Sequence, residues 1–227
     1  PESSPWTRPQ SVHEAMTEMT YELGLDFRYL TSARVTAGEL TTDEFRVLLL
    51  PISAAISPEE AEAVRAFVAA GGTVIADVRP GVFDGHCKPL ETGALDDVFG
   101  ITRTARDAAL EGAVQVATEL EGVPLAIDLA KTKLDAGVQA ATAEALATVG
   151  DTPVLLVNRF GQGRAILLNF QLPASGEDNA ETMSARLLLG ALYRVAGASA
   201  PVSVAAPNGA PLPFTETRTW RNGDALI

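Results

Sequence analysis

Apolar residues recur along the chain at helical and at strand spacings, and these spacings divide it into elements. From Ser11 to Leu23 they follow a helical interval, and Gly24 suits the left-handed position after a helix end. The apolar positions of this predicted helix are Val12, Met16, Met19 and Leu23. Asp26 to Leu30, which follows, is interpreted as a short strand.

The clearest pattern is a strand, a capped helix and a second strand in succession. Phe45 to Pro51 is a nearly continuous apolar run, typical of a strand covered on both faces. Ser57 and Glu60 have the spacing of a helix capping box, and the helix that they begin ends at Gly71-Gly72. Thr73 to Val78 is the second apolar strand. This βαβ unit predicts two parallel strands.

The second half of the chain predicts a β insertion and a hairpin. We expect a short helix from Gly93 to Phe99 and a small irregular β insertion at about residues 101–150. Pro153 to Phe160 and Arg164 to Phe170 flank Gly161-Gln162-Gly163, which is the pattern of an antiparallel hairpin.

A long helix and a β-rich end complete the predicted fold. Asp178 to Ala196 is the helix, with its apolar side at Met183, Leu187, Ala191 and Val195. Phe214 to Trp220 and Asp224 to Ile227 predict a further hairpin. The whole pattern indicates an α/β fold with a doubly wound, mostly parallel sheet and helices on both faces. One domain is expected over residues 1–197, and residues 198–227 are expected to begin a small β domain or tail.

Composition and charge narrow the possible partners. Of 227 residues, 47% are hydrophobic, enough for a sizeable core. The net charge of −12 argues against nucleic acid and anionic membrane surfaces as partners. The apolar runs have the length of strands, so no membrane span is expected. Cys87 is the single cysteine, which excludes an internal disulfide and fits the cytoplasm without requiring it. Because the chain starts at Pro1 and stops in an apolar run, we expect a fragment of a longer protein.

Several ordered blocks carry a resemblance to a known family. They are Val47-Leu48-Leu49-Leu50-Pro51, Ser57-Pro58-Glu59-Glu60, Phe67-Val68-Ala69-Ala70-Gly71-Gly72-Thr73, Gly81-Val82-Phe83-Asp84, Leu95 to Ile101, and Asn158-Arg159-Phe160-Gly161-Gln162-Gly163-Arg164-Ala165. In this order they resemble the middle domain of family 42 β-galactosidases, called the trimerisation domain. That domain has a flavodoxin-like fold related to class I glutamine amidotransferases.

The resemblance implies an accessory domain rather than an enzyme. In the family this domain sits beside a catalytic (β/α)₈ barrel of the same chain, packs protomers into a homo-oligomer, and can border the sugar pocket. The two catalytic carboxylates of the barrel would lie outside these 227 residues. The leading hypothesis is therefore a non-catalytic domain that serves oligomerisation or interdomain packing in a larger glycoside hydrolase.

Cys87 is the obvious candidate nucleophile, because amidotransferases place a cysteine on a tight turn directly after a strand. Here that turn falls near Val78 and is followed by Arg79-Pro80, and proline removes an amide donor that an oxyanion hole needs. Cys87 comes about nine residues after the turn, as counted from the sequence. We expect no catalytic residue, and a cysteine hydrolase built on Cys87 stays as an alternative.

Metal and cofactor sites are not expected. Asp84, His86 and Cys87 could be read as a metal cluster, but zinc sites usually need four ligands, or three plus water, and a second cluster to complete them. The only other histidine, His13, is on the first predicted helix, and there is no cysteine pair. Adjacent acids such as Glu59-Glu60 stand at helix starts, where they complement the helix dipole. We therefore do not assign them as the paired catalytic carboxylates of a glycoside hydrolase.

One ligand site is predicted from topology alone. Ligands of parallel α/β sheets collect at the carboxyl ends of the strands, where the loops after Pro51 and Val78 offer side chains. These candidate ligand-binding residues are Ser53, Arg79, Asp84 and His86. A carbohydrate-binding module is a second alternative, weakened because only 6% of residues are aromatic and the two tryptophans, Trp6 and Trp220, stand near opposite ends.

Overall fold

The computed structural model describes residues 9–104, 108–173 and 179–200, and short stretches between 202 and 226. Its main sheet has five strands, in the order β1 (Val47–Leu50), β2 (Thr73–Ala76), β9 (Gly163–Leu168), β8 (Thr152–Phe160) and β7 (Glu144–Val149). β1, β2 and β9 are parallel, which confirms the predicted βαβ unit, whereas β8 pairs antiparallel with β9 and β7.

The predicted hairpin of β8 and β9 is confirmed, but it belongs to the main sheet, which is therefore mixed rather than mostly parallel. Two-residue turns, 150–151 and 161–162, join β7 to β8 and β8 to β9. Turns this short can connect only antiparallel neighbours, because a parallel pair needs a crossover of a dozen or more residues. The fold is mixed α/β, with small antiparallel sheets beside the main one.

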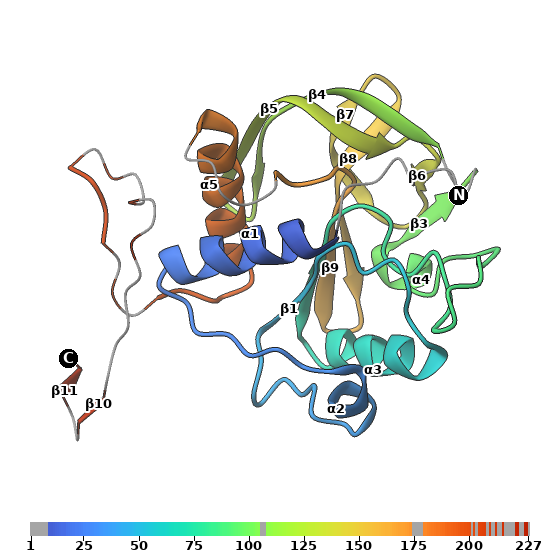
Figure 1. Ribbon diagram of the computed structural model, residues 1–227, viewed down its shortest axis with the longest axis horizontal. Helices are drawn as coiled ribbons and strands as arrows, with labels where there is room; N and C mark the ends of the chain where they lie inside the picture. The colour runs from blue at the N-terminus through green and yellow to red at the C-terminus, as the bar shows by residue number, and fades with distance from the viewer. Residues whose placement is uncertain are drawn as a thin grey trace.

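Helices cover both faces of the main sheet, as the sequence predicts. They are α1 (Pro9–Glu22), α2 (Ser32–Thr36), α3 (Pro58–Ala69), α4 (Asp96–Phe99) and α5 (Ala180–Val195). Because side chains alternate along a strand, Val74 and Ala76 pack in one core with α3 and α4, whereas Ile75 packs in another with α1 and α5. We call these the α3-side core and the α1–α5 core. The helices α1 and α5 lie next to each other, and β5 runs along α5 (Figure 1).

The capped helix α3 and the β8–β9 hairpin fit together. Ser57 N–H donates to Glu60 Oε2 at 2.9 Å, and Glu60 N–H donates to Ser57 Oγ at 3.2 Å, which confirms the capping box. At the far end, Gln162 N–H donates to the Ala69 carbonyl at 3.0 Å. A Cβ on Gly163 would stand 2.2 Å from the Val68 carbonyl oxygen. The glycine of the predicted hairpin turn is therefore required by packing against α3.

The β insertion is more regular than expected. β4 (Ala109–Leu120) and β5 (Val123–Asp135) form a long antiparallel ribbon, and β3 (Ile101–Arg103) pairs with β6 (Val138–Ala140). The last strand of the predicted insertion, β7, belongs to the main sheet. The insertion is thus confirmed as β structure, but not as an irregular unit.

Two element predictions are wrong. Asp26 to Leu30 pairs with no strand in the structure. On α5 the predicted apolar side includes Leu187, which is 46% exposed. The buried side follows the i, i+3, i+4, i+7 spacing at Ala185, Leu188, Leu189 and Leu192. A constant spacing of four residues drifts around a helix of 3.6 residues per turn, which is why Leu187 faces solvent although Ala191 of the same set is buried.

The end of the chain is described only in part. β10 (Arg221–Asn222) pairs antiparallel with β11 (Ala225–Leu226), at the turn of the predicted hairpin. Most of the predicted strand from Phe214 to Trp220 lies outside the described residues.

Candidate functional site

The loops that follow β1 and β2 lie against each other at the carboxyl ends of the strands. Gly81 N–H donates to the Ser53 carbonyl at 2.9 Å, and Phe83 N–H donates to the Ala54 carbonyl at 2.8 Å. Ile56 N–H in turn donates to the Phe83 carbonyl at 3.0 Å. These bonds bring the predicted Ser53 loop and Arg79 loop together. The backbone of the two loops therefore occupies part of the crevice in which ligands of such sheets collect.

Arg79 occupies the sharp turn that follows β2. Its φ of +64° is left-handed, a conformation that few residues other than glycine adopt and that nucleophile turns after a strand share. The turn residue is thus Arg79, one position after the Val78 expected from the sequence. A guanidinium is always protonated, so it cannot attack an acyl group as a thiol does.

The Arg79 side chain is buried next to a group of opposite charges. Its Nε lies 4.0 Å from Asp135 Oδ2, and the same oxygen accepts from Arg103 Nη1 at 2.9 Å. Arg103 Nε also donates to Asp96 Oδ1 at 3.0 Å. All four side chains are nearly inaccessible to solvent. This buried ion network joins the turn after β2 to β3, α4 and the end of β5, which is a holding role rather than a reactive one.

A third buried acid, Asp77, directly follows β2. Its Oδ1 accepts from Ile52 N–H at 2.5 Å, and Ile52 itself has a left-handed φ of +40°. Burial raises the pKa of Asp77 to about 8, so the carboxyl is mainly protonated at neutral pH. Its Oδ2 has no hydrogen-bond partner among the residues that the structure describes. Asp77 therefore shapes the loop after β1, and nothing in the sequence marked it.

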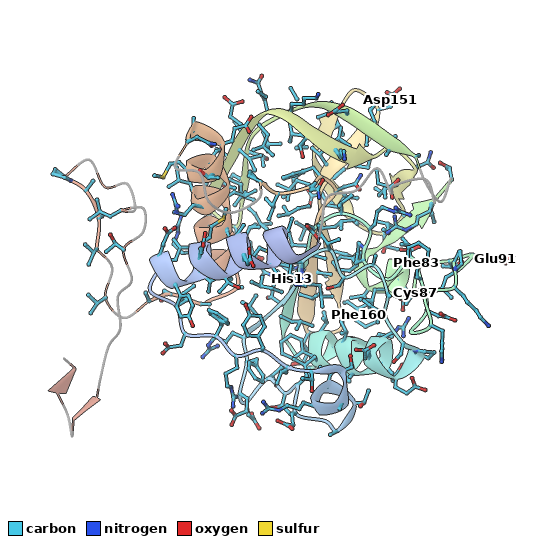
Figure 2. All side chains as sticks on the ribbon, viewed as in Figure 1. His13, Phe83, Cys87, Glu91, Asp151 and Phe160 are labelled. Atoms are coloured by element: carbon cyan, nitrogen blue, oxygen red, sulfur yellow. The ribbon has the colours of Figure 1, made fainter. Side chains whose placement is uncertain are left out.

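Asp84 and His86 belong to an exposed turn of the same loop. The Asp84 carboxylate accepts from Lys88 N–H at 2.9 Å and His86 N–H at 2.8 Å, and these backbone bonds lower its pKa. The His86 and Cys87 side chains are exposed. In Figure 2 the loop with Phe83 and Cys87 lies away from His13 on α1. The Asp84 carboxylate thus stabilises the turn through its hydrogen bonds to the backbone.

The described residues include neither a candidate metal site nor a thiol–imidazole pair. Across this part of the chain, no group of three or more His, Cys, Asp and Glu side chains could hold a metal ion. The Cys87 thiol has no imidazole partner there either. In the described residues no helix has the length and apolar character to cross a membrane.

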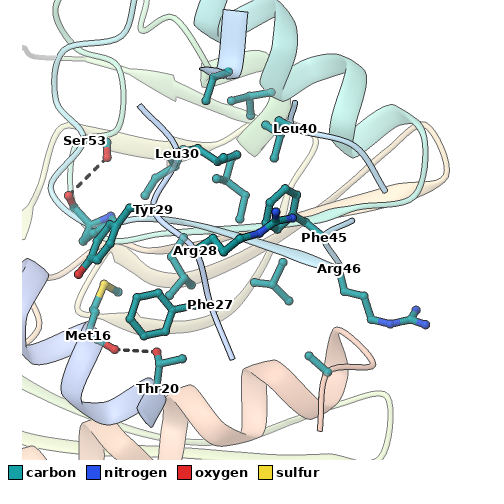
Figure 3. A pocket seen from close by; sticks show the side chains of 18 of the residues that line it. Met16, Thr20, Phe27, Arg28, Tyr29, Leu30, Leu40, Phe45, Arg46 and Ser53 are labelled. Atoms are coloured by element: carbon teal, nitrogen blue, oxygen red, sulfur yellow. Dashed lines mark hydrogen bonds between the residues drawn. The ribbon is translucent and has the colours of Figure 1, made fainter. Parts of the chain in front are cut away.

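Sequence reasoning missed a cavity of about 630 Å³ beside the outer edge of β1 (Figure 3). Of the four predicted ligand-binding residues, only Ser53 lines it. Phe27 and Tyr29 line the cavity, and their ring centroids are 5.4 Å apart; the Tyr21 ring contacts Phe27 with its centroid at 4.7 Å. The one signal in the sequence that could have pointed to this cavity is that these aromatic residues shortly precede an apolar strand.

The fold is mixed α/β: the main sheet is mixed, helices cover both its faces, and Arg79 occupies the turn that follows β2. Residues 33–195 match the family model described as the beta-galactosidase trimerisation domain, so the chain belongs to this family. The resemblance identified from the sequence blocks is thereby confirmed. No curated protein sequence matches the chain.

Solved structures share the fold at low identity. The beta-galactosidase from Bacillus circulans sp. alkalophilus aligns with a TM-score of 0.64 at 19% identity, covering 89% of this chain and 29% of its own. A catalytic mutant of Gan42B, a GH42 beta-galactosidase from G. stearothermophilus, aligns at 0.58 and 16% identity, covering 86% and 27%. A cytoplasmic protein from Salmonella typhimurium aligns at 0.55 and 13% identity, covering 79% and 85%. The chain thus spans less than a third of the length of the galactosidases that it matches.

Proposed function

We propose that this chain is a non-catalytic accessory domain of a larger, β-galactosidase-like glycoside hydrolase and that it packs protomers or domains together. The observation that carries the proposal is the family match over residues 33–195. The partners on this proposal are a catalytic barrel of the same chain and further copies of the protein. The domain would extend over residues 1–197, with its β insertion at about 101–150, and residues 198–227 would start a small β domain or tail.

The finer fold assignment is part of the same proposal. The parallel strands β1, β2 and β9, with α3 connecting β1 to β2, are one half of a flavodoxin-like, class I glutamine amidotransferase-like fold. The left-handed turn at Arg79 supports this assignment, because it keeps the backbone geometry of a nucleophile turn without a nucleophile. In place of chemistry, the turn takes part in the buried ion network with Asp135.

Measuring mass and activity together tests the proposed role. The full-length protein is compared by sedimentation with a version that lacks residues 33–195, and both are assayed on aryl β-galactosides. We expect the full-length protein to be oligomeric and the shortened one to lose that assembly, while the 227-residue chain alone hydrolyses no glycoside, amide or ester. An unchanged oligomeric state in the shortened protein, or hydrolysis by the chain alone, would contradict the proposal.

Carbohydrate binding is a second candidate, supported by one observation. Tyr29, in the ring cluster at the cavity, is 68% exposed, and exposed rings are platforms for sugar faces. Titration with galactosides, followed by tyrosine fluorescence, tests it, with Tyr29→Ala as the matched variant. Binding at the carboxyl ends of the strands by Ser53, Arg79, Asp84 and His86 stays a separate proposal, and Arg79→Ala is its variant in the same titration.

A further inference from the structure

A buried ion pair joins the first half of α5 to the end of α1. Arg186 Nε donates to Glu22 Oε2, and both side chains are nearly inaccessible to solvent. The two helices lie next to each other (Figure 1). A guanidinium has five N–H groups in a fixed planar fork, so one carboxylate oxygen does not satisfy it. Arg186 therefore needs further acceptors in a place that water hardly reaches.

One of these acceptors is the sulfur of Met183, three residues earlier on the same helix. Arg186 Nη1 donates to Met183 Sδ at 3.7 Å. A thioether sulfur is a weak acceptor, whereas a buried charged donor is costly to leave poorly bonded. An oxygen atom on this sulfur would therefore suit the guanidinium better than the sulfur itself.

The three methionines of the chain differ in their access to solvent. Met16 and Met19, on α1, are 2% and 3% exposed and pack in the α1–α5 core. Met183 is partly exposed and belongs to neither core. Because a solvent-borne oxidant must reach the sulfur, it reaches Met183 far more easily than the other two.

We propose that Met183 is an oxidation site for hydroperoxides and that Arg186 receives the oxygen atom which its sulfur acquires. A lone pair of the sulfur attacks one oxygen of hydrogen peroxide, and the O–O bond breaks. The departing hydroxide takes the proton of the transferred hydroxyl group, so one thioether and one peroxide give one sulfoxide and one water. The sulfur loses two electrons, which the peroxide gains. The site is independent of the assembly role proposed above.

The position of Arg186 makes oxidation compatible with the fold. A sulfoxide is polar, and at Met16 or Met19 it would put a polar group into an apolar core. At Met183 its oxygen accepts a charge-assisted hydrogen bond, which is stronger than the bond to the sulfur. Since Nε and Nη1 are different atoms of the fork, the ion pair with Glu22 persists. Met183 thus consumes a peroxide without loss of structure, and sulfoxide reductases can restore it.

Peptide mapping by mass spectrometry after exposure to hydrogen peroxide tests the site. The protein is the 227-residue chain with Cys87→Ser, because the exposed thiol of Cys87 would also react. In the folded protein, Met183 should be oxidised at least about tenfold faster than Met16 and Met19, whereas in urea all three should react at similar rates. Equal rates in the folded protein would overturn the proposal.

Melting temperatures before and after oxidation test the part of Arg186. At a peroxide exposure that converts Met183 alone, the parent protein should melt about 2–4 °C higher, because a strong acceptor replaces a weak one. Arg186→Lys keeps a charge opposite Glu22 but lacks the fork that reaches both partners, so it should lose this rise. A fall in the parent, or equal shifts in the two proteins, would show that Arg186 does not receive the oxygen.

Two further measurements exclude other causes of the shift. Met183→Leu has no sulfur at this position, and its melting temperature should not respond to the same peroxide exposure. A response would place the effective oxidation elsewhere and overturn the site. In the parent protein, the NMR signals of the Arg186 guanidinium protons should move downfield on oxidation, a readout that does not depend on the folding of Arg186→Lys. Unchanged signals would contradict the new hydrogen bond.

Discussion

At the scale of single residues, Asp77 should make stability depend on pH. Its carboxyl keeps its proton up to about pH 8 when folded but loses it near 3.8 when unfolded. Between these values the unfolded chain binds fewer protons, so the free energy of unfolding falls as pH rises, by at most about 1.4 kcal/mol per pH unit. Asp77→Asn cannot ionise, and it should remove this slope in urea unfolding at pH 5, 6, 7 and 8.

Asp84 gives the matched control, because its pKa is lowered rather than raised. The stability that it contributes is present above its unfolded pKa and is lost as pH falls through the lower folded value. Asp84→Asn should therefore leave the slope between pH 5 and 8 unchanged. A slope that persists unchanged in Asp77→Asn would show that another group causes it and would contradict the raised pKa of Asp77.

Cys87 is the residue on which the cysteine hydrolase alternative depends. It is exposed and has no imidazole partner among the described side chains. Cys87→Ser should change the free energy of unfolding by no more than about 0.5 kcal/mol, since surface substitutions rarely do more. The same variant should leave any hydrolysis by the full-length protein unchanged, and loss of hydrolysis would revive the alternative.

At the scale of elements, the buried ion network should be the most sensitive polar contact between the β insertion and the main sheet. Arg103→Ala leaves Asp96 and Asp135 buried without their shared guanidinium, which should cost about 3–5 kcal/mol. Arg28→Ala removes an exposed ion pair with Glu44 and should cost less than about 1 kcal/mol. Denaturant unfolding measures both, and equal costs would show that the network does not support the fold.

At the same scale, the close contact between α3 and the β8–β9 hairpin should make Gly163 sensitive to substitution. Gly163→Ala drives a Cβ against the carbonyl oxygens of Val68 and Gly72, and it should destabilise the fold by about 1–3 kcal/mol. At Gly112 in β4 the added Cβ meets nothing within 4 Å, so Gly112→Ala serves as the control. Thermal unfolding of the two variants should differ accordingly, and matching melting temperatures would contradict the contact.

How much the sequence predicts depends on how local the cause is. The capping box of Ser57 and Glu60 depends only on residues within one stretch of four, and the sequence predicts it correctly. The pairing of β2 with β9 joins residues far apart in the chain, and no periodicity shows it. For the same reason, the sequence does not predict the ion pairs of Asp135 with Arg79 and Arg103, which are distant in the chain. The predicted strand at Asp26 to Leu30 failed for a related reason, since its alternation fixes its faces but not its partner.

At the scale of the whole molecule, charge should oppose assembly. The chain has a net charge of −12, so copies that approach each other repel over about one Debye length, roughly 10 Å at 0.1 M salt. If apolar contacts carry the proposed packing of protomers, screening by salt should strengthen it. Sedimentation of the full-length protein at low and high sodium chloride should then show the larger species favoured at high salt. Dissociation at high salt would mean that ion pairs between copies hold the assembly, because screening weakens an assembly only where the charge contacts between copies are attractive.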